Sequence, residues 1–340
     1  MQLDTELGES AWPDEEGFAA RIAENIRTSI VRRYPPERRP ARRDAHPKAH
    51  GCVRAEVSVR ADLPASFAHG VFVPGASYAA WVRFSNGSGN PKRPDFLGDA
   101  RGMAIKLLGV PGEKLLPGER AATTQDFVLI SHPTFFVDDP RCYARLVARS
   151  TSRNRLVAAM APLVLGWKGL MITRRITAKQ IASPLETRYW STVPFALGVG
   201  PERRAVKFSA RPSVAGTSTV PADPDPDYLR HAMIRTLDAA DASFDLLVQP
   251  RAGPWMSVED PRTEWTESEA PFEHVATLRI PRQVFATPER DAFGENLSFT
   301  PWHALPDHRP LGGVNRIRRV VYEAIATLRH ELNGVERREP

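Results

Sequence analysis

The sequence predicts an α+β protein built on an antiparallel β-barrel of short strands with helices inserted between them. Seven short apolar or alternating runs, bounded by Gly, Pro and Asn, have the pattern of strands. The 31 prolines are spread along 340 residues, which favours turns over long helices. Hydrophobic residues make up 42% and charged residues 25%, so the composition excludes a disordered chain, a coiled coil and a collagen-like repeat.

The first element is an amphipathic helix. Apolar residues recur every four positions from Phe18 to Ile30, which predicts a helix over 15–31 with Asp14 and Glu15 at its N-terminus. The following stretch, 32–43, reads RRYPPERRPARR, and its prolines exclude a regular helix or a sheet strand. We expect an extended arm there.

The strands and the remaining helices alternate after this arm. The predicted strands are 52–59, 78–85, 102–109, 126–131, 205–210, 244–249 and 274–280. Helical patterns lie at 138–150, 154–180, 226–240 and 315–332. The last of these is the strongest, because apolar residues line one side of it and Asn333-Gly334 ends it.

Charge and cysteine content limit the partners and the compartment. The formal charge of +6 does not by itself indicate a nucleic-acid partner, and we expect none. The start is acidic and polar, unlike a secretory signal, and the two cysteines, Cys52 and Cys142, fit a reducing compartment. We therefore expect a cytoplasmic protein. The most apolar stretch, 156–172, falls short of the ~20 apolar residues of a membrane span, but it leaves weak contact with a membrane surface open.

One group of residues points to metal chemistry. Arg318, Tyr322 and Arg329 are spaced by four and seven, so they share one face of the C-terminal helix. A tyrosine on an apolar helical stripe is usually a core residue. Here a cation one turn earlier favours the phenolate, because opposite charge lowers the phenol pKa. A tyrosine phenolate as the proximal haem ligand is typical of catalase.

Five segments of the chain resemble haem catalases, in the order in which that family has them. They are RDAHPKAHG (43–51), VRFSNGSG (82–89), DARGMAIKL (99–107), FTPWHALP (299–306) and RRVVY (318–322). The chain is thus similar to the small, bacterial, catalase-related proteins that consist of the core domain without the flavodoxin-like and long helical C-terminal parts. The resemblance implies an eight-stranded barrel over 43–314, preceded by a helix and arm over 1–42. A proximal haem helix and tail over 315–340 would follow.

The resemblance also implies a role for each matching residue. Tyr322 would bind the iron of haem b, and Arg318 would hold it as phenolate. His46 would be the distal acid–base, with Ser85 fixing its ring. The haem propionates would pair with Arg43, Arg83 and Arg329, and Phe136 would stack on the distal face of the haem.

Three departures from the family bear on these roles. A threonine, Thr123 or Thr124, is expected where catalases place a distal asparagine. Ala45 precedes the distal histidine, where catalases usually have valine and the related allene oxide synthases have threonine. The segment after His46 is one residue short, so His50 is a rival for the distal role.

The resemblance implies an enzyme that decomposes or reduces peroxides, as a catalase, a peroxidase or both, through an oxoferryl intermediate. Its substrates would be hydrogen peroxide or organic hydroperoxides, and a homo-oligomer, either dimer or tetramer, is expected. The alternative is a fatty acid hydroperoxide isomerase or lyase of the allene oxide synthase type. A haem carrier or sensor without enzymatic activity is a third reading.

Overall fold

The computed structural model describes residues 3–337 and 339–340 and is organised around a closed antiparallel barrel. Hydrogen bonds run through β5-β4-β3-β2-β1-β9-β8-β7, and pairing of β5 with β7 closes the ring of eight strands. A ninth strand, β6, pairs with β7 outside the ring. The strands are β1 Ala49–Val59, β2 Ser77–Asn86, β3 Arg101–Leu108, β4 Thr124–Ile130, β5 Tyr189–Trp190, β6 Phe195–Leu197, β7 Arg204–Pro212, β8 Ala242–Pro250 and β9 Glu273–Ile280. The predicted eight-stranded barrel is confirmed.

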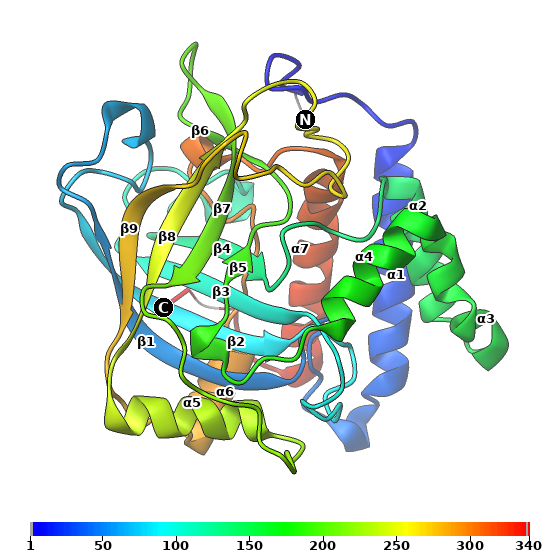
Figure 1. Ribbon diagram of the computed structural model, residues 1–340. Helices are drawn as coiled ribbons and strands as arrows, with labels where there is room; N and C mark the ends of the chain where they lie inside the picture. Colours follow the sequence, from blue (N-terminus) through cyan, green and yellow to red (C-terminus); the bar gives the residue numbers. More distant parts are fainter. Residues whose placement is uncertain (1–2, 338) are drawn as a thin grey trace.

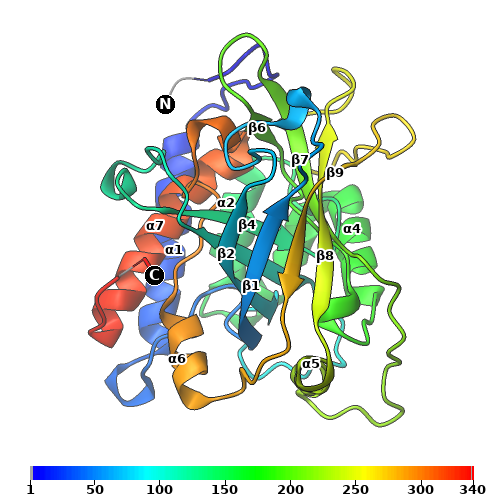
Figure 2. The same ribbon diagram turned by 90° about the vertical axis from the view of Figure 1, so that its left-hand side faces the viewer.

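Helices cover one flank and one end of this barrel. They are α1 Glu15–Arg33, α2 Pro140–Ser150, α3 Arg155–Ala159, α4 Gly166–Ala178, α5 Tyr228–Ala239, α6 Pro288–Asn296 and α7 Gly313–Asn333. Figure 1 shows α1 and α7 side by side on one flank of the barrel, with α3 at the outer edge and α4 crossing in front of α1. In the view of Figure 2, α5 and α6 lie at the lower end of the strands.

The two largest hydrophobic cores of the described residues lie inside and beside the barrel. Alternating strand residues fill the barrel, where Phe72, Phe127 and Phe208 pack ring against ring around His308. The second core lies outside the barrel, among α1, α2 and α7. The four-residue spacing of the first helix explains it, because Ile22 and Ile30 face inward there and are fully buried.

The structure corrects one helix and adds elements that the sequence did not predict. The predicted helix over 154–180 is broken into α3, a 3₁₀ turn at Ala161–Leu165 and α4. Pro162 lies in the turn and Gly166 has φ 61°, so an α-helix cannot continue through it. Strands β5 and β6 and helix α6 were not predicted. None of the helices in the described part of the chain is long and apolar enough to cross a membrane.

Candidate active site

A cavity of about 180 Å³ lies between α7 and the outer wall of the barrel. Its walls come from α1, α2, α7, strands β2 to β4 and the two segments 43–46 and 298–299. The lining residues are Ile26, Arg43, Asp44, Ala45, His46, Arg83, Ser85, Gly102, Met103, Ala104, Val128, Leu129, Tyr143, Ser298, Phe299, Val321, Tyr322, Ile325, Ala326 and Arg329. The cavity therefore brings together six of the predicted site residues from distant parts of the chain, namely Arg43, His46, Arg83, Ser85, Tyr322 and Arg329.

His46 is held in a strained backbone conformation at this cavity. Its φ of 61° lies in the left-handed region, which a residue other than glycine seldom adopts. The Arg83 side chain fixes the peptide by donating to the His46 carbonyl at 2.9 Å. Burial lowers the pKa of His46 to about 3, and the nearby cations of Arg83, Arg318 and Arg43 add to this effect. The imidazole is therefore neutral at pH 7.

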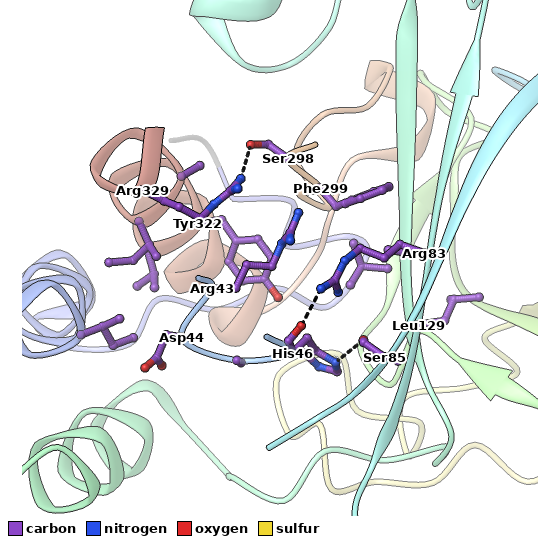
Figure 3. A pocket seen from close by; sticks show the side chains of 18 of the residues that line it. Arg43, Asp44, His46, Arg83, Ser85, Leu129, Ser298, Phe299, Tyr322 and Arg329 are labelled. Atoms are coloured by element: carbon purple, nitrogen blue, oxygen red, sulfur yellow. Dashed lines mark hydrogen bonds between the residues drawn. The ribbon is translucent and has the colours of Figure 1, made fainter. Parts of the chain in front are cut away.

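The orientation of this imidazole depends on two small residues. Nδ1 of His46 lies 3.0 Å from the Ser85 hydroxyl oxygen, as Figure 3 shows. Gly102 pairs with Ser85 across β2 and β3 and lies directly under the ring. A Cβ atom on Gly102 would be 2.5 Å from His46 Nδ1 and 2.9 Å from Ser85 Oγ. Glycine is thus required here for the histidine–serine pair to fit.

Three guanidinium groups gather at one edge of the cavity around a carboxylate. Glu295 of α6 lies 3.1 Å from Arg43, 3.6 Å from Arg83 and 4.0 Å from Arg329. Burial and the neighbouring Arg43 lower the pKa of both Arg83 and Arg329 to about 9. The cluster thus holds three cations and one anion, an excess of two positive charges. Within the described residues, Nε of Arg83 is buried without a hydrogen-bond acceptor, and Nη1 of Arg43 contacts Glu295 at 3.1 Å without forming a well-aligned hydrogen bond. Glu295 was not predicted, since no sequence signal connects it with the arginines.

Tyr322 faces the cavity from α7. Figure 3 shows its ring projecting from the helix with the hydroxyl turned toward the segment that carries His46. Arg318 is buried one turn earlier. Its guanidinium donates to Asn315 at 3.5 Å and lies 5.2 Å from the centre of the Phe135 ring. Neither of these contacts involves Tyr322, so the role of Arg318 in holding Tyr322 as phenolate stays a prediction.

Phe136 is not among the residues that line the cavity, whereas Tyr143 and Phe299 are. Phe136 stacks on Phe135 with ring centres 4.4 Å apart, and its carbonyl lies against Gly169 of α4. Tyr143 is carried inward on α2, and burial, opposed by Arg318, raises its pKa to about 12. Phe136 thus lies outside the cavity, and the structure does not support its predicted stacking on a haem there.

The predicted distal threonines lie elsewhere. Thr124 begins β4, and its hydroxyl bonds to His303 and to Glu339, the latter at 2.9 Å. The Thr123 carbonyl accepts a hydrogen bond from the Val110 amide in the turn before β4. Strand β4 meets the cavity near its other end, through Val128 and Leu129. The sequence reasoning placed the wrong end of this strand at the site.

His50 is also outside the cavity. It is fully buried in β1, where its Nε2 lies 2.9 Å from Asn86 Oδ1 and its Nδ1 lies 3.7 Å from Asp95. Burial and the charge of Arg101 lower its pKa to about 3. His46, rather than its rival, therefore faces Tyr322.

The donor set of the cavity fits a haem. A phenol oxygen on α7 is a hard ligand suited to ferric iron. The excess of two positive charges at the arginine edge matches the two carboxylates of haem, and guanidinium forks bind carboxylates in a bidentate manner. Between these polar groups the walls are apolar, with Met103, Leu129 and Ile325 among them. No group of three His, Cys, Asp or Glu side chains elsewhere in the described residues could hold a metal ion.

Comparison with known proteins points to the catalases. No family model matches the chain. A protein named catalase-related peroxidase from Mycolicibacterium paratuberculosis is 29% identical over 275 residues, which cover 77% of this chain and 80% of the relative. A fungal catalase has the same fold with a TM-score of 0.68 and 18% identity, covering 86% of this chain. Catalase A of Saccharomyces cerevisiae has a TM-score of 0.61, 16% identity and 86% coverage of this chain.

The chain spans 60% of the length of the fungal catalase and 63% of that of catalase A. The resemblance predicted from five sequence segments is confirmed, and the chain has a catalase-like core fold.

Proposed function

We propose that this chain is a haem-dependent enzyme that consumes peroxides, with haem b between α7 and the barrel wall and Tyr322 as the iron ligand. One observation carries the proposal: a phenol on α7 and a neutral, buried imidazole face the same cavity, and three guanidinium groups lie at its edge. Haem supplies, when bound, an iron centre at which the O–O bond of a peroxide is broken.

His46 would move the proton in this reaction. With Nδ1–H donated to Ser85, Nε2 would be the basic nitrogen and would take a proton from one peroxide oxygen. The same nitrogen would then give that proton to the other oxygen, so that neutral water or an alcohol could leave. A neutral imidazole is needed for the first transfer, which the low pKa of His46 provides.

The arginine edge would orient the cofactor. Arg43, Arg83 and Arg329 would pair with the propionates, and the buried Nε of Arg83 would gain a hydrogen-bond acceptor. Arg83 would then act twice, because it also fixes the His46 carbonyl. Cofactor position and proton-transfer geometry would depend on the same side chain.

The cavity favours peroxidase turnover over oxygen release. Disproportionation requires a second hydrogen peroxide to be positioned by distal polar groups, and β4 offers Val128 and Leu129 there. Reduction of an organic hydroperoxide does not require this positioning of a second peroxide, and the apolar wall accommodates the hydrocarbon part of the substrate. The name of the mycobacterial relative, a catalase-related peroxidase, agrees with this preference.

The test combines spectroscopy with two activity assays on haem-loaded protein. We expect a high-spin ferric spectrum, oxidation of a dye donor with an organic hydroperoxide, and slow oxygen release from hydrogen peroxide per mole of haem. Tyr322→Phe should lose the spectrum and the stable haem, whereas Tyr78→Phe, on β2 outside the cavity, should keep both. Full haem occupancy with an unchanged spectrum in Tyr322→Phe would refute the ligand assignment. Rapid oxygen release would refute the peroxidase preference alone.

The other expectations have no further support. No observation favours the fatty acid hydroperoxide isomerase or the haem carrier, and both stay predictions. Cytoplasmic location and a homo-oligomer are likewise retained as proposals.

A further inference from the structure

A short, strongly apolar surface lies at the outer end of the helices that follow β4. Its large side chains are Leu156, Met160, Leu163 and Trp167, which are 77%, 51%, 61% and 79% exposed. They fall within twelve residues, across α3, the 3₁₀ turn and the start of α4. We call them the apolar tip. Figure 1 shows α3 at the edge of the molecule, far from the barrel. Clustered exposure of this kind marks an interaction surface, whereas single exposed apolar residues do not.

The tip is an ordered part of the fold. The Asn154 side chain caps α3 by accepting hydrogen bonds from the amides of Leu156 and Val157. Leu165 and Ile172 are buried and tie the turn and α4 to the body of the protein. The segment therefore has buried apolar residues that pack on the protein and further apolar residues, those of the apolar tip, that stay exposed.

The surroundings of the tip are exclusively basic in sequence. Residues 140–179 contain seven arginines and two lysines and no aspartate or glutamate. This segment carries +9, so the rest of the chain carries −3, given the total of +6. All nine side chains are exposed. Within the described residues, Lys168 alone among them has a carboxylate at ion-pair distance, that of Asp260 at 3.6 Å.

We propose that the apolar tip docks the protein on an anionic membrane surface. Leucine, methionine and tryptophan would enter the boundary between headgroups and acyl chains, where tryptophan is most favourable, and the arginines would contact anionic headgroups. A second copy of the chain is disfavoured as the occupant. A symmetric contact would place nine positive charges against nine others, with no carboxylate in the segment to compensate.

The test measures binding of the full chain to vesicles, by sedimentation and by tryptophan fluorescence. We expect binding to phosphatidylcholine vesicles that contain phosphatidylserine and little binding to phosphatidylcholine alone. Because each basic residue near such a surface is worth about fivefold in binding, Arg153→Gln with Arg155→Gln should weaken binding roughly 25-fold. Trp167→Ala should weaken it about tenfold. The matched control is Trp255→Ala, which removes another tryptophan, 60% exposed, in a loop after β8.

Three results would overturn the proposal. The first is equal binding to neutral and anionic vesicles, and the second is unchanged binding by the arginine variant. The third is a dimer that Leu163→Asp converts to a monomer, since the tip would then be a contact between copies. Peroxide consumption by the same variants in solution is expected to stay unchanged. Failure of the docking proposal is therefore distinguishable from failure of the proposed activity.

Discussion

Gly102→Ala would displace the distal histidine without removing any reacting group. The added Cβ would lie 2.5 Å from His46 Nδ1, whereas an ordinary contact begins at 3.4 Å, so the ring must move by about 0.9 Å. Its partner Ser85 cannot take up the shift, because its oxygen would be 2.9 Å from the same Cβ. Misplacement of a catalytic group by about 1 Å costs on the order of 100-fold in rate. The overpacking itself costs about 1–3 kcal/mol of stability.

The assay is peroxide consumption per mole of bound haem, with thermal unfolding measured in parallel. We expect Gly102→Ala to bind haem and to lose about 100-fold in turnover. Gly118→Ala is the matched control, because a Cβ there meets no atom within 4 Å. Wild-type turnover in a folded Gly102→Ala protein would refute the reasoning that close packing on Gly102 positions His46.

Three further predictions concern the buried titratable groups. His46→Ala should keep haem and lose peroxide cleavage, while His50→Ala should lower stability and keep turnover in the protein that remains folded; the reverse pattern would make His50 the distal base. Stability should fall as pH drops from 6.5 toward 3, because His50 and His308 bind protons in the unfolded chain over this range but not in the folded protein. Both have a pKa of about 3 when folded. Each contributes a slope of about 1.4 kcal/mol per pH unit, so flat denaturation midpoints between pH 7 and pH 5 would contradict the burial argument. Glu295→Gln should lower the melting temperature of the haem-free protein by roughly 2–4 °C and that of the haem-loaded protein by less, since propionates replace the lost charge; equal shifts would show that the two do not share the arginines.

The sequence predicted the barrel well because its long strands carry their own signals. Strands β1 to β4 and β7 to β9 alternate in burial or are flanked by turn residues, and each was placed within a few residues. Strand β5 has two residues and β6 has three, too short for any periodicity. Helix α6 reads PERDAFGEN, in which no apolar stripe can be recognised. The break at Pro162 and Gly166 was visible in the sequence, and the helix should have been divided there.

Site residues were predictable where a motif fixed their register and not elsewhere. Tyr322, His46, Ser85 and the arginines lie inside matched segments, and all of them line the cavity except Arg318. The threonine assignment failed because sequence does not show which end of β4 meets the site. Thr124 is five residues from Leu129, which is ~17 Å along a strand. Glu295 and Tyr143 were missed, because only the folded chain brings α6 and α2 to the cavity.

The position of the cavity between the two cores has a consequence for how a cofactor can enter. The barrel wall is a closed ladder of backbone hydrogen bonds, so it resists local opening. The layer of α1, α2 and α7 is attached to that wall by side-chain packing, and its core is separate. We expect the helical layer to separate from the barrel wall at a lower free energy than global unfolding requires. Amide hydrogen exchange should then be faster in α1 than in β2 and β3. A flat macrocycle could then be loaded into a protein whose barrel is already folded.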